Sequence, residues 1–209
     1  MTREPTRDSG GGSDPEPCRS RRPLRKLAFI GSHGVGKTTL TYGLAARLKA
    51  RDVALEVLVE VARRCPLTLN EETDLAAQSW ILHTQIADEL VATTRYPLVL
   101  CDRSVLDNYV YLLLAVGRRP ELETLIAHWL GTYDLLVHVP VVEGAPMLAD
   151  GVRSTDQAFQ GAVERRLAAE LLHFGVEPLW LDPARRESWL EEVEAAVIES
   201  LRSPQLDLL

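Results

Sequence analysis

The chain has 209 residues, 46% of them hydrophobic and 25% charged, which is the composition of one globular domain with a buried core. Its formal net charge of −7 argues against an extended nucleic-acid groove, where neutralised phosphates supply most of the affinity. No apolar run approaches the ~20 residues that span a bilayer, and the first residues lack the apolar core of a signal peptide. We therefore expect no nucleic-acid partner, no membrane partner and a cytoplasmic location.

Three parts are expected along the chain. Residues 1–24 are dominated by Gly, Ser, Pro and mixed charges, which predicts a disordered arm. Residues 25–203 carry the apolar segments of a folded domain, and residues 204–209 form a tail. The three cysteines are too few and too scattered for a disulfide framework or a metal site, so reduced thiols are expected at Cys18, Cys65 and Cys101.

Within the domain, short apolar runs alternate with amphipathic stretches, which predicts strands alternating with helices. In chain order we expect a strand at Lys26–Ser32, a helix at Gly36–Ala50, a strand at Ala54–Val61, a helix at Thr73–Arg95, a strand at Pro97–Asp102, helices at Val105–Val116 and Glu121–Leu130, a strand at Tyr133–Pro140, an irregular segment at Glu143–Asp156, a helix at Gln157–Phe174, a strand at Glu177–Asp182 and a helix at Arg186–Leu201. Strands separated by helices predict a parallel sheet with helices on both faces, a three-layer α/β fold.

The long helix expected at Thr73–Arg95 has two stripes of interest. Its apolar residues fall on one side, which predicts the buried face: Leu75, Leu82, Ile86 and Leu90. The amides of Gln78 and Gln85 share another stripe at helical spacing. Two interpretations stay open for these amides: they read a substrate ring, or they face solvent.

The stretch GSHGVGKT at residues 31–38 matches the phosphate-loop pattern GxxxxGK followed by Ser or Thr. Its glycines let successive N–H groups turn inward as an anion nest, and the following helix points its positive end at the same anion. Lys37 would add a charge near the β- and γ-phosphates of ATP, and the Thr38 hydroxyl would ligate Mg²⁺. His33 occupies a variable position and is expected to be a filler or surface residue. The predicted ATP-binding residues are Gly31, Ser32, His33, Gly34, Val35, Gly36, Lys37, Thr38 and Thr39.

Charged residues follow the apolar runs at positions that face the same crevice. Asp102 ends the third strand, where a carboxylate would coordinate Mg²⁺, and Arg103 after it would clamp a substrate or a transferring phosphate. Glu60 near the end of the second strand is open to two readings, a proton acceptor or a charged cap. Arg153 lies in a segment that would close over ATP as a flap. The candidate catalytic residues are Lys37, Glu60, Asp102, Arg103 and Arg153, with Thr38 and Asp102 as metal ligands.

Taken together, these residues resemble the small-kinase branch of phosphate-loop proteins, especially deoxynucleoside and thymidylate kinases. In deoxynucleoside kinases the matching glutamate is the base toward the sugar hydroxyl and the matching arginine helps to place the substrate, which implies those roles for Glu60 and Arg103. The region of residues 143–156 departs from that family because it lacks a run of closely spaced arginines.

A closer resemblance is to a family of AAA-type ATPases that groups the ribosylnicotinamide-kinase domain of bacterial NAD regulators with stand-alone ATPases. The shared patterns are E-x-A-R at Glu60–Arg63, D-R-S-x-x-D-x-x-x-Y at Asp102–Tyr111 and D-G-x-R-x-x-D at Asp150–Asp156. By analogy, the resemblance implies a five-stranded sheet in the order 2-3-1-4-5.

Two functions remain open from the sequence. The first is a kinase that transfers the γ-phosphoryl group of ATP, with Mg²⁺, to a hydroxyl of a nucleoside-like small molecule. The alternative is a stand-alone regulatory ATPase whose nucleotide state controls a partner interaction. A GTPase would need an NKxD-type guanine reader, and an ABC-type ATPase would need an LSGGQ-like signature, and the chain contains neither pattern. A homodimer is also left open.

Overall fold

Five strands form one parallel sheet in the order β2-β3-β1-β4-β5 in the computed structural model, which describes residues 24–69, 73–142 and 157–201. The strands are β1 (Lys26–Ile30), β2 (Leu55–Leu58), β3 (Leu98–Cys101), β4 (Leu135–His138) and β5 (Leu179–Trp180). All four strand pairings are parallel. The expected sheet and its strand order are confirmed.

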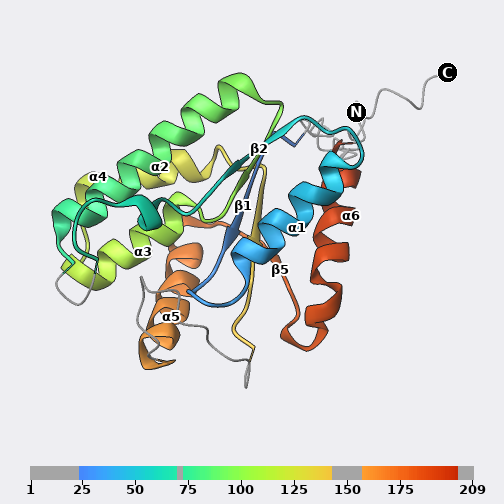
Figure 1. Cartoon of the computed structure of the whole chain (residues 1–209). Helices are drawn as coiled ribbons and strands as arrows, with labels where there is room; N and C mark the ends of the chain where they lie inside the picture. The colour runs from blue at the N-terminus through green and yellow to red at the C-terminus, as the bar shows by residue number, and fades with distance from the viewer. Residues whose placement is uncertain (1–23, 70–72, 143–156, 202–209) are drawn as a thin grey trace, which may run out of the picture.

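Helices cover both faces of this sheet, as Figure 1 shows. They are α1 (Lys37–Lys49), α2 (Leu75–Arg95), α3 (Val105–Val116), α4 (Pro120–Leu130), α5 (Gln157–Phe174) and α6 (Trp189–Leu201), with short 3₁₀ helices η1 (Val61–Arg64) and η2 (Pro183–Ser188). α1 and α6 pack side by side on one face, while α2, α3, α4 and α5 cover the other. The three-layer α/β architecture is therefore confirmed.

The central strand β1 is buried along its whole length. Leu27 and Phe29 point into the core beneath α1 and α6, whereas Ala28 and Ile30 point into the core beneath the other helices. A strand covered on both faces does not need polar residues at alternate positions. This burial accounts for the unbroken apolar run that marks β1 in the sequence.

Most of the expected elements have ends shifted by one to three residues in the structure, and two of these shifts have a clear cause. β2 stops at Leu58 because the chain turns into η1, so Glu60 lies beyond the strand and occupies the position before the first residue of η1. The last helix begins at Trp189, because residues before it form η2, which contains a non-helical residue at Arg185. Glu60 is thus held by a turn of 3₁₀ helix rather than by the sheet.

The buried face of α2 is only partly the one that hydrophobic periodicity predicts: Leu82 is in the core and Ile86 packs against it. Leu75 and Leu90 are 39% and 53% exposed, so this part of the prediction is wrong. The buried side of the helix instead carries polar groups: Gln78, Gln85 and Glu89. Each of these side chains has a hydrogen-bond partner, which offsets the cost of removing it from water.

Glu89 is the centre of a fully buried polar cluster. Its carboxylate accepts hydrogen bonds from Lys26 Nζ at 2.8 Å, Trp129 Nε1 at 2.6 Å, Tyr133 Oη at 2.6 Å and Gln85 Nε2 at 2.8 Å. Lys26 also lies over the Tyr133 ring, 4.3 Å from its centroid. A buried charge is tolerated when it is paired and hydrogen-bonded in this way. The cluster fastens α2 and α4 to the first residue of β1.

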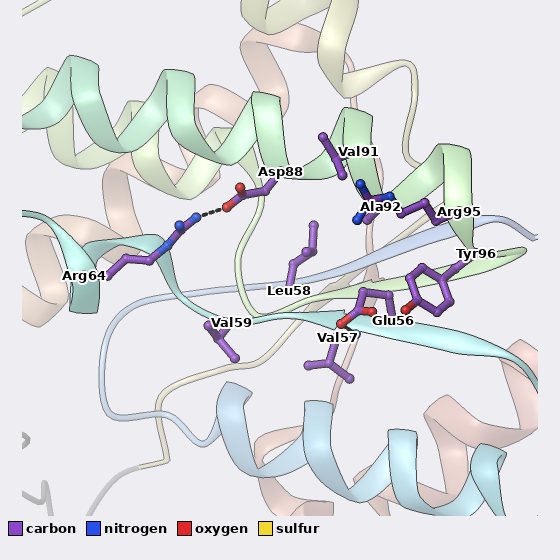
Figure 2. Close-up of a pocket in the computed structure, with 10 residues that line it drawn as sticks. All are labelled: Glu56, Val57, Leu58, Val59, Arg64, Asp88, Val91, Ala92, Arg95 and Tyr96. Atoms are coloured by element: carbon purple, nitrogen blue, oxygen red, sulfur yellow. Dashed lines mark hydrogen bonds and ion pairs between the residues drawn. The ribbon is translucent and has the colours of Figure 1, made fainter.

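A surface groove runs between the free edge of β2 and the C-terminal half of α2, shown in Figure 2. Its lining residues are Glu56, Val57, Leu58, Val59, Arg64, Asp88, Val91, Ala92, Arg95 and Tyr96. None of the candidate site residues is among them, so this groove and the candidate site are separate features. Within the described residues, no helix is both long enough and apolar enough to cross a membrane.

Candidate active site

The phosphate loop connects β1 to α1 and depends on glycine geometry at its first position. Gly31 has φ +140°, and a Cβ added there would lie 2.5 Å from the carbonyl oxygen of Val139. Gly34 and Gly36 also have positive φ, at +77° and +102°. These backbone angles are the ones that turn successive N–H groups toward a common anion. The loop therefore has the conformation expected of a phosphate nest.

Lys37 is buried and is held by the loop that it follows. Its Nζ donates to the carbonyl oxygens of Gly31, at 2.9 Å, and Ser32, at 2.5 Å. These bonds fold the side chain back across the loop rather than outward into solvent. The ammonium group is consequently placed beside the N–H groups of the nest, where it would add a full positive charge for a bound phosphate.

Thr38 and Asp102 lie together although 64 positions separate them in sequence. The Thr38 hydroxyl, in the first turn of α1, donates to Asp102 Oδ2 at 2.6 Å. Asp102 follows directly after β3, which neighbours β1 in the sheet. A hydroxyl and a carboxylate are hard oxygen ligands, and Mg²⁺ commonly takes only one or two such protein ligands besides phosphate and water. The pair therefore fits the predicted magnesium site.

Three side chains from α3 and α5 hold the start of the phosphate loop. Asp107 Oδ1 accepts from the Gly31 N–H at 3.0 Å, and Glu164 Oε1 accepts from the Ser32 N–H at 2.7 Å. Gln160 Nε2 donates to the His33 carbonyl at 2.8 Å. Sequence reasoning missed these roles. Of the three residues, only Asp107 could have been found from the sequence, because Ser104 with an acidic residue three positions later is typical of a capping box at the start of a helix.

Glu164 is also bound by His138, the last residue of β4. His138 Nε2 lies 3.0 Å from Glu164 Oε2. Burial by itself raises the pKa of Glu164, but the hydrogen bonds from His138 and from the Ser32 N–H outweigh it and lower the pKa below its ordinary value. Glu164 therefore stays ionised while it holds the loop.

His33 is neither a filler nor a surface residue, which corrects the prediction. It is 3% exposed, and its Nδ1 lies 3.1 Å from the hydroxyl of Tyr111 on α3. Its ring also stacks on Phe159 of α5, with centroids 5.8 Å apart. Its variable place in the loop pattern gave no hint of these contacts, which come from two distant helices.

Glu60 and Arg103 form a buried ion pair next to the Thr38–Asp102 pair. Arg103 Nε donates to Glu60 Oε1 at 2.8 Å, and the second carboxylate oxygen lies 3.3 Å from Arg63 Nε. Arg103 adjoins Asp102 in sequence, so the pair is covalently tied to the Thr38–Asp102 contact. The two nominated residues Glu60 and Arg103 are thus brought together with Lys37, Thr38 and Asp102.

Arg103 carries two signs of a functional residue. Its backbone φ is +121°, a strained value for a residue with a side chain, and such strain gathers at functional sites. Nη1 and Nη2 are buried without a hydrogen-bond partner in the described part of the chain, and Nη1 lies 3.7 Å from Asp107 Oδ1. Burial lowers the pKa of the guanidinium, but Tyr111 and Asp107 raise it more, so Arg103 stays charged.

Both helix amides of α2 are buried, so the solvent-facing reading is wrong. Gln85 donates to Glu89 and, at 3.3 Å, to the carbonyl of Arg103, which fixes the strained backbone there. Gln78 Nε2 donates to Thr73 Oγ1 at 2.9 Å. The Gln85 amide is therefore occupied by hydrogen bonds within the protein. Gln78 is the amide that remains a candidate for contact with a substrate ring.

One nominated catalytic residue, Arg153, lies outside the described residues, as does the whole stretch from Asp150 to Asp156. Its expected approach to the γ-phosphate remains a prediction.

Comparison with known proteins agrees with this geometry. A family described as an AAA domain matches residues 26–189, most of the chain. A search of curated protein sequences finds no match.

The fold is shared with solved structures of low sequence identity. A crystal structure of NadR protein in complex with NR superposes with a TM-score of 0.66 at 20% identity and covers 87% of this chain. The chain spans about half of that NadR chain, 53%. Two structures of deoxyadenosine kinase from M. mycoides, one with dCMP and dCDP and one with dATP, give TM-scores of 0.57 and 0.58 at 14% and 13% identity. Each covers 83% of this chain and is itself 99% covered.

Proposed function

The chain belongs to the family of AAA domains, and on that premise we propose that it is a kinase that transfers the γ-phosphoryl group of ATP to a hydroxyl of a nucleoside-like small molecule. The observation that carries the proposal is the junction of two pairs, Thr38–Asp102 and Glu60–Arg103, at consecutive residues Asp102 and Arg103. Phosphoryl transfer needs groups that hold the donor beside groups that hold the acceptor. A hydrolytic switch has no evident use for a buried carboxylate–arginine pair at this position.

On the donor side, the loop N–H groups and Lys37 would bind the phosphates of ATP. Thr38 and Asp102 would hold Mg²⁺, which would offset the charge of the phosphate oxygens during transfer. Asp107 and Glu164 already accept from the N–H groups of Gly31 and Ser32, so they hold the start of the loop, and the phosphates would be bound by the loop N–H groups that follow. Arg153 is the proposed additional cation at the γ-phosphate.

On the acceptor side, Glu60 would take the proton of the attacking hydroxyl as its oxygen forms a bond to the γ-phosphorus and the bond to the leaving ADP oxygen breaks. Arg103 would donate Nη1 and Nη2 to the acceptor. Unmet donors on a buried cation are costly, so an acceptor oxygen that satisfies them binds favourably. The small molecules bound in the NadR and deoxyadenosine kinase structures support an acceptor of this class. Gln78 is the proposed contact for its ring.

The test is a measurement of ADP release from Mg·ATP with a panel of nucleosides, nucleotides and ribosylnicotinamide. We expect one acceptor class to raise ADP release well above the rate without acceptor. Lys37→Ala should abolish that turnover because it removes the phosphate-binding cation. ADP release that is indifferent to every acceptor would instead support the regulatory ATPase. A homodimer stays a prediction, which sedimentation velocity would test.

A further inference from the structure

Tyr111 of α3 lies between the two halves of the candidate site. The guanidinium carbon of Arg103 is 5.0 Å from the centroid of the Tyr111 ring. The hydroxyl at the far end of the same side chain is 3.1 Å from Nδ1 of His33, a residue of the phosphate loop. One side chain therefore contacts both the acceptor-side cation and the donor-side loop.

The ring of Tyr111 completes the placement of Arg103. The hydrogen bond from Nε to Glu60 fixes one edge of the guanidinium, while the two terminal nitrogens have no hydrogen-bond partner in the described residues and Nη1 lies 3.7 Å from Asp107 Oδ1. An aromatic face beneath a buried cation attracts it and sets its plane. Phe159 in turn packs against the Tyr111 ring, with centroids 6.1 Å apart at 60°. The Tyr111 ring is thus itself held in place by Phe159.

The hydroxyl of Tyr111 contacts His33, a residue of the phosphate loop that other side chains also hold in place. His33 stacks on Phe159, and its carbonyl accepts from Gln160. Burial raises the pKa of Tyr111 above its ordinary value even though Arg103 opposes the shift, so the hydroxyl stays protonated at neutral pH. The contact with His33 is therefore a hydrogen bond of the protonated phenol.

We propose that Tyr111 is a positioning residue that sets the plane of the Arg103 guanidinium with its ring and holds the phosphate loop in register with it through His33. Its effect on catalysis rests on the proposed kinase function. The positioning itself is a property of the folded chain and is measured without any acceptor.

The first experiment separates the ring from the hydroxyl. Tyr111→Phe keeps the ring under Arg103, whereas Tyr111→Leu removes both contacts. The readout is hydrogen exchange of the Arg103 Nε–H in ¹⁵N NMR, assigned by its loss in Arg103→Lys. We expect unchanged exchange in Tyr111→Phe and exchange at least about tenfold faster in Tyr111→Leu. Tyr42→Leu, at an exposed tyrosine of α1, is the matched control and should leave the signal unchanged.

The second experiment tests the link to His33 by binding of Mg·ATP, measured by calorimetry. We expect Tyr111→Phe to weaken binding about fivefold in the otherwise unchanged chain, the size of one hydrogen bond. On a His33→Ala background the same change should cost less than about threefold, because the imidazole partner is gone and only the contact with the backbone of residue 33 is left. An equal cost on both backgrounds, or none on either, would overturn the link between Tyr111 and His33.

In the exchange experiment, the opposite result is an Arg103 Nε–H that exchanges at the same rate in Tyr111→Leu as in the wild type. That result would overturn the role of the ring. If Tyr111→Leu does not fold, Tyr111→Met is used in its place.

With an acceptor that supports turnover, the two variants should separate in kinetics. Tyr111→Leu should raise the acceptor KM at least about tenfold, whereas Tyr111→Phe should leave it within about twofold and raise the KM of ATP. The same acceptor KM in both variants would contradict the proposal. If no acceptor in the panel supports turnover, the kinase function fails, while exchange and ATP binding still decide the role of Tyr111.

Discussion

Each oxygen of the Glu60 carboxylate lies near a different arginine, and this limits what the residue can do in a reaction. One oxygen accepts from Arg103, and the other lies near Arg63, which is partly exposed. The sequence left two readings of Glu60, a proton acceptor and a charged cap, and the structure gives it features of both. It precedes a 3₁₀ turn as a cap would, yet it is buried beside a cation that adjoins the metal ligands.

Replacing Glu60 by Gln tests its proposed chemistry directly. The amide oxygen still accepts from Arg103, but the side chain no longer takes a proton. We expect turnover to fall about 10²- to 10⁴-fold while Mg·ATP affinity stays within about twofold. The measurement is steady-state kinetics with calorimetry as the binding control. A fall of less than about threefold would leave Glu60 as a structural cap only.

Substitutions at Asp102 and Thr38 test whether these residues bind Mg²⁺. Asp102→Asn removes the charge that favours Mg²⁺, so the Mg²⁺ concentration for half-maximal activity should rise at least about tenfold. Thr38→Ser keeps a hydroxyl at the same place and should change this concentration little, which makes it the matched control. An unaltered Mg²⁺ requirement in Asp102→Asn would remove Asp102 from the metal site.

At the scale of elements, the turn from β1 into the phosphate loop sets the geometry of the donor side. Gly31→Ala would place a methyl group against the Val139 carbonyl at a backbone angle that side chains disfavour. We expect a loss of about 2–4 kcal/mol in unfolding free energy together with weaker ATP binding. Gly175→Ala is the control: its φ is +64°, and no atom lies within 4 Å of an added Cβ, so a loss of about 1–2 kcal/mol is expected. Urea unfolding measures both, and equal losses would contradict the close approach at Gly31.

The elements that sequence predicts best are those whose signal is local. Residues 157–174 form α5 with the predicted ends, and β1 follows from its unbroken apolar run. The buried face of α2 was predicted at Leu82 and Ile86, but its polar part was missed because Gln85 and Glu89 are buried through partners on other elements, which helical periodicity does not contain. The strand order came from a family resemblance, since periodicity does not specify which strands are neighbours.

The same distinction separates the site residues that were predicted from those that were missed. Asp102 follows directly after β3, and Lys37 and Thr38 begin the helix that the phosphate loop joins to β1, so parallel topology brings them to one edge of the sheet. Glu164 contacts Ser32, 132 positions away in sequence, and Tyr111, although it ends the shared pattern D-R-S-x-x-D-x-x-x-Y, contacts His33, 78 positions away. No local pattern contains contacts of that range.

At the scale of the whole molecule, Glu164 links acid stability to the phosphate loop. Its pKa is lowered in the folded chain from an ordinary value of 4.5, so it stabilises the fold above that pH, and this contribution is lost as the pH falls below 4.5 through the folded value. Glu164→Gln should therefore flatten the loss of stability below pH 4.5. The measurement is urea unfolding between pH 3 and pH 7. Glu187→Gln, at an exposed position of η2, is the control, and identical curves for the two variants would contradict the role of Glu164.

In the proposed kinase function, a donor half and an acceptor half of the site meet at Asp102 and Arg103. The most direct test of this account follows the fate of the γ-phosphoryl group of ATP labelled with ³²P, with and without the acceptor that best stimulates ADP release. The account predicts that the label appears on the acceptor in a one-to-one ratio with ADP and that Lys37→Ala abolishes both. Label that appears only as inorganic phosphate, at the same rate with and without the acceptor, would contradict it.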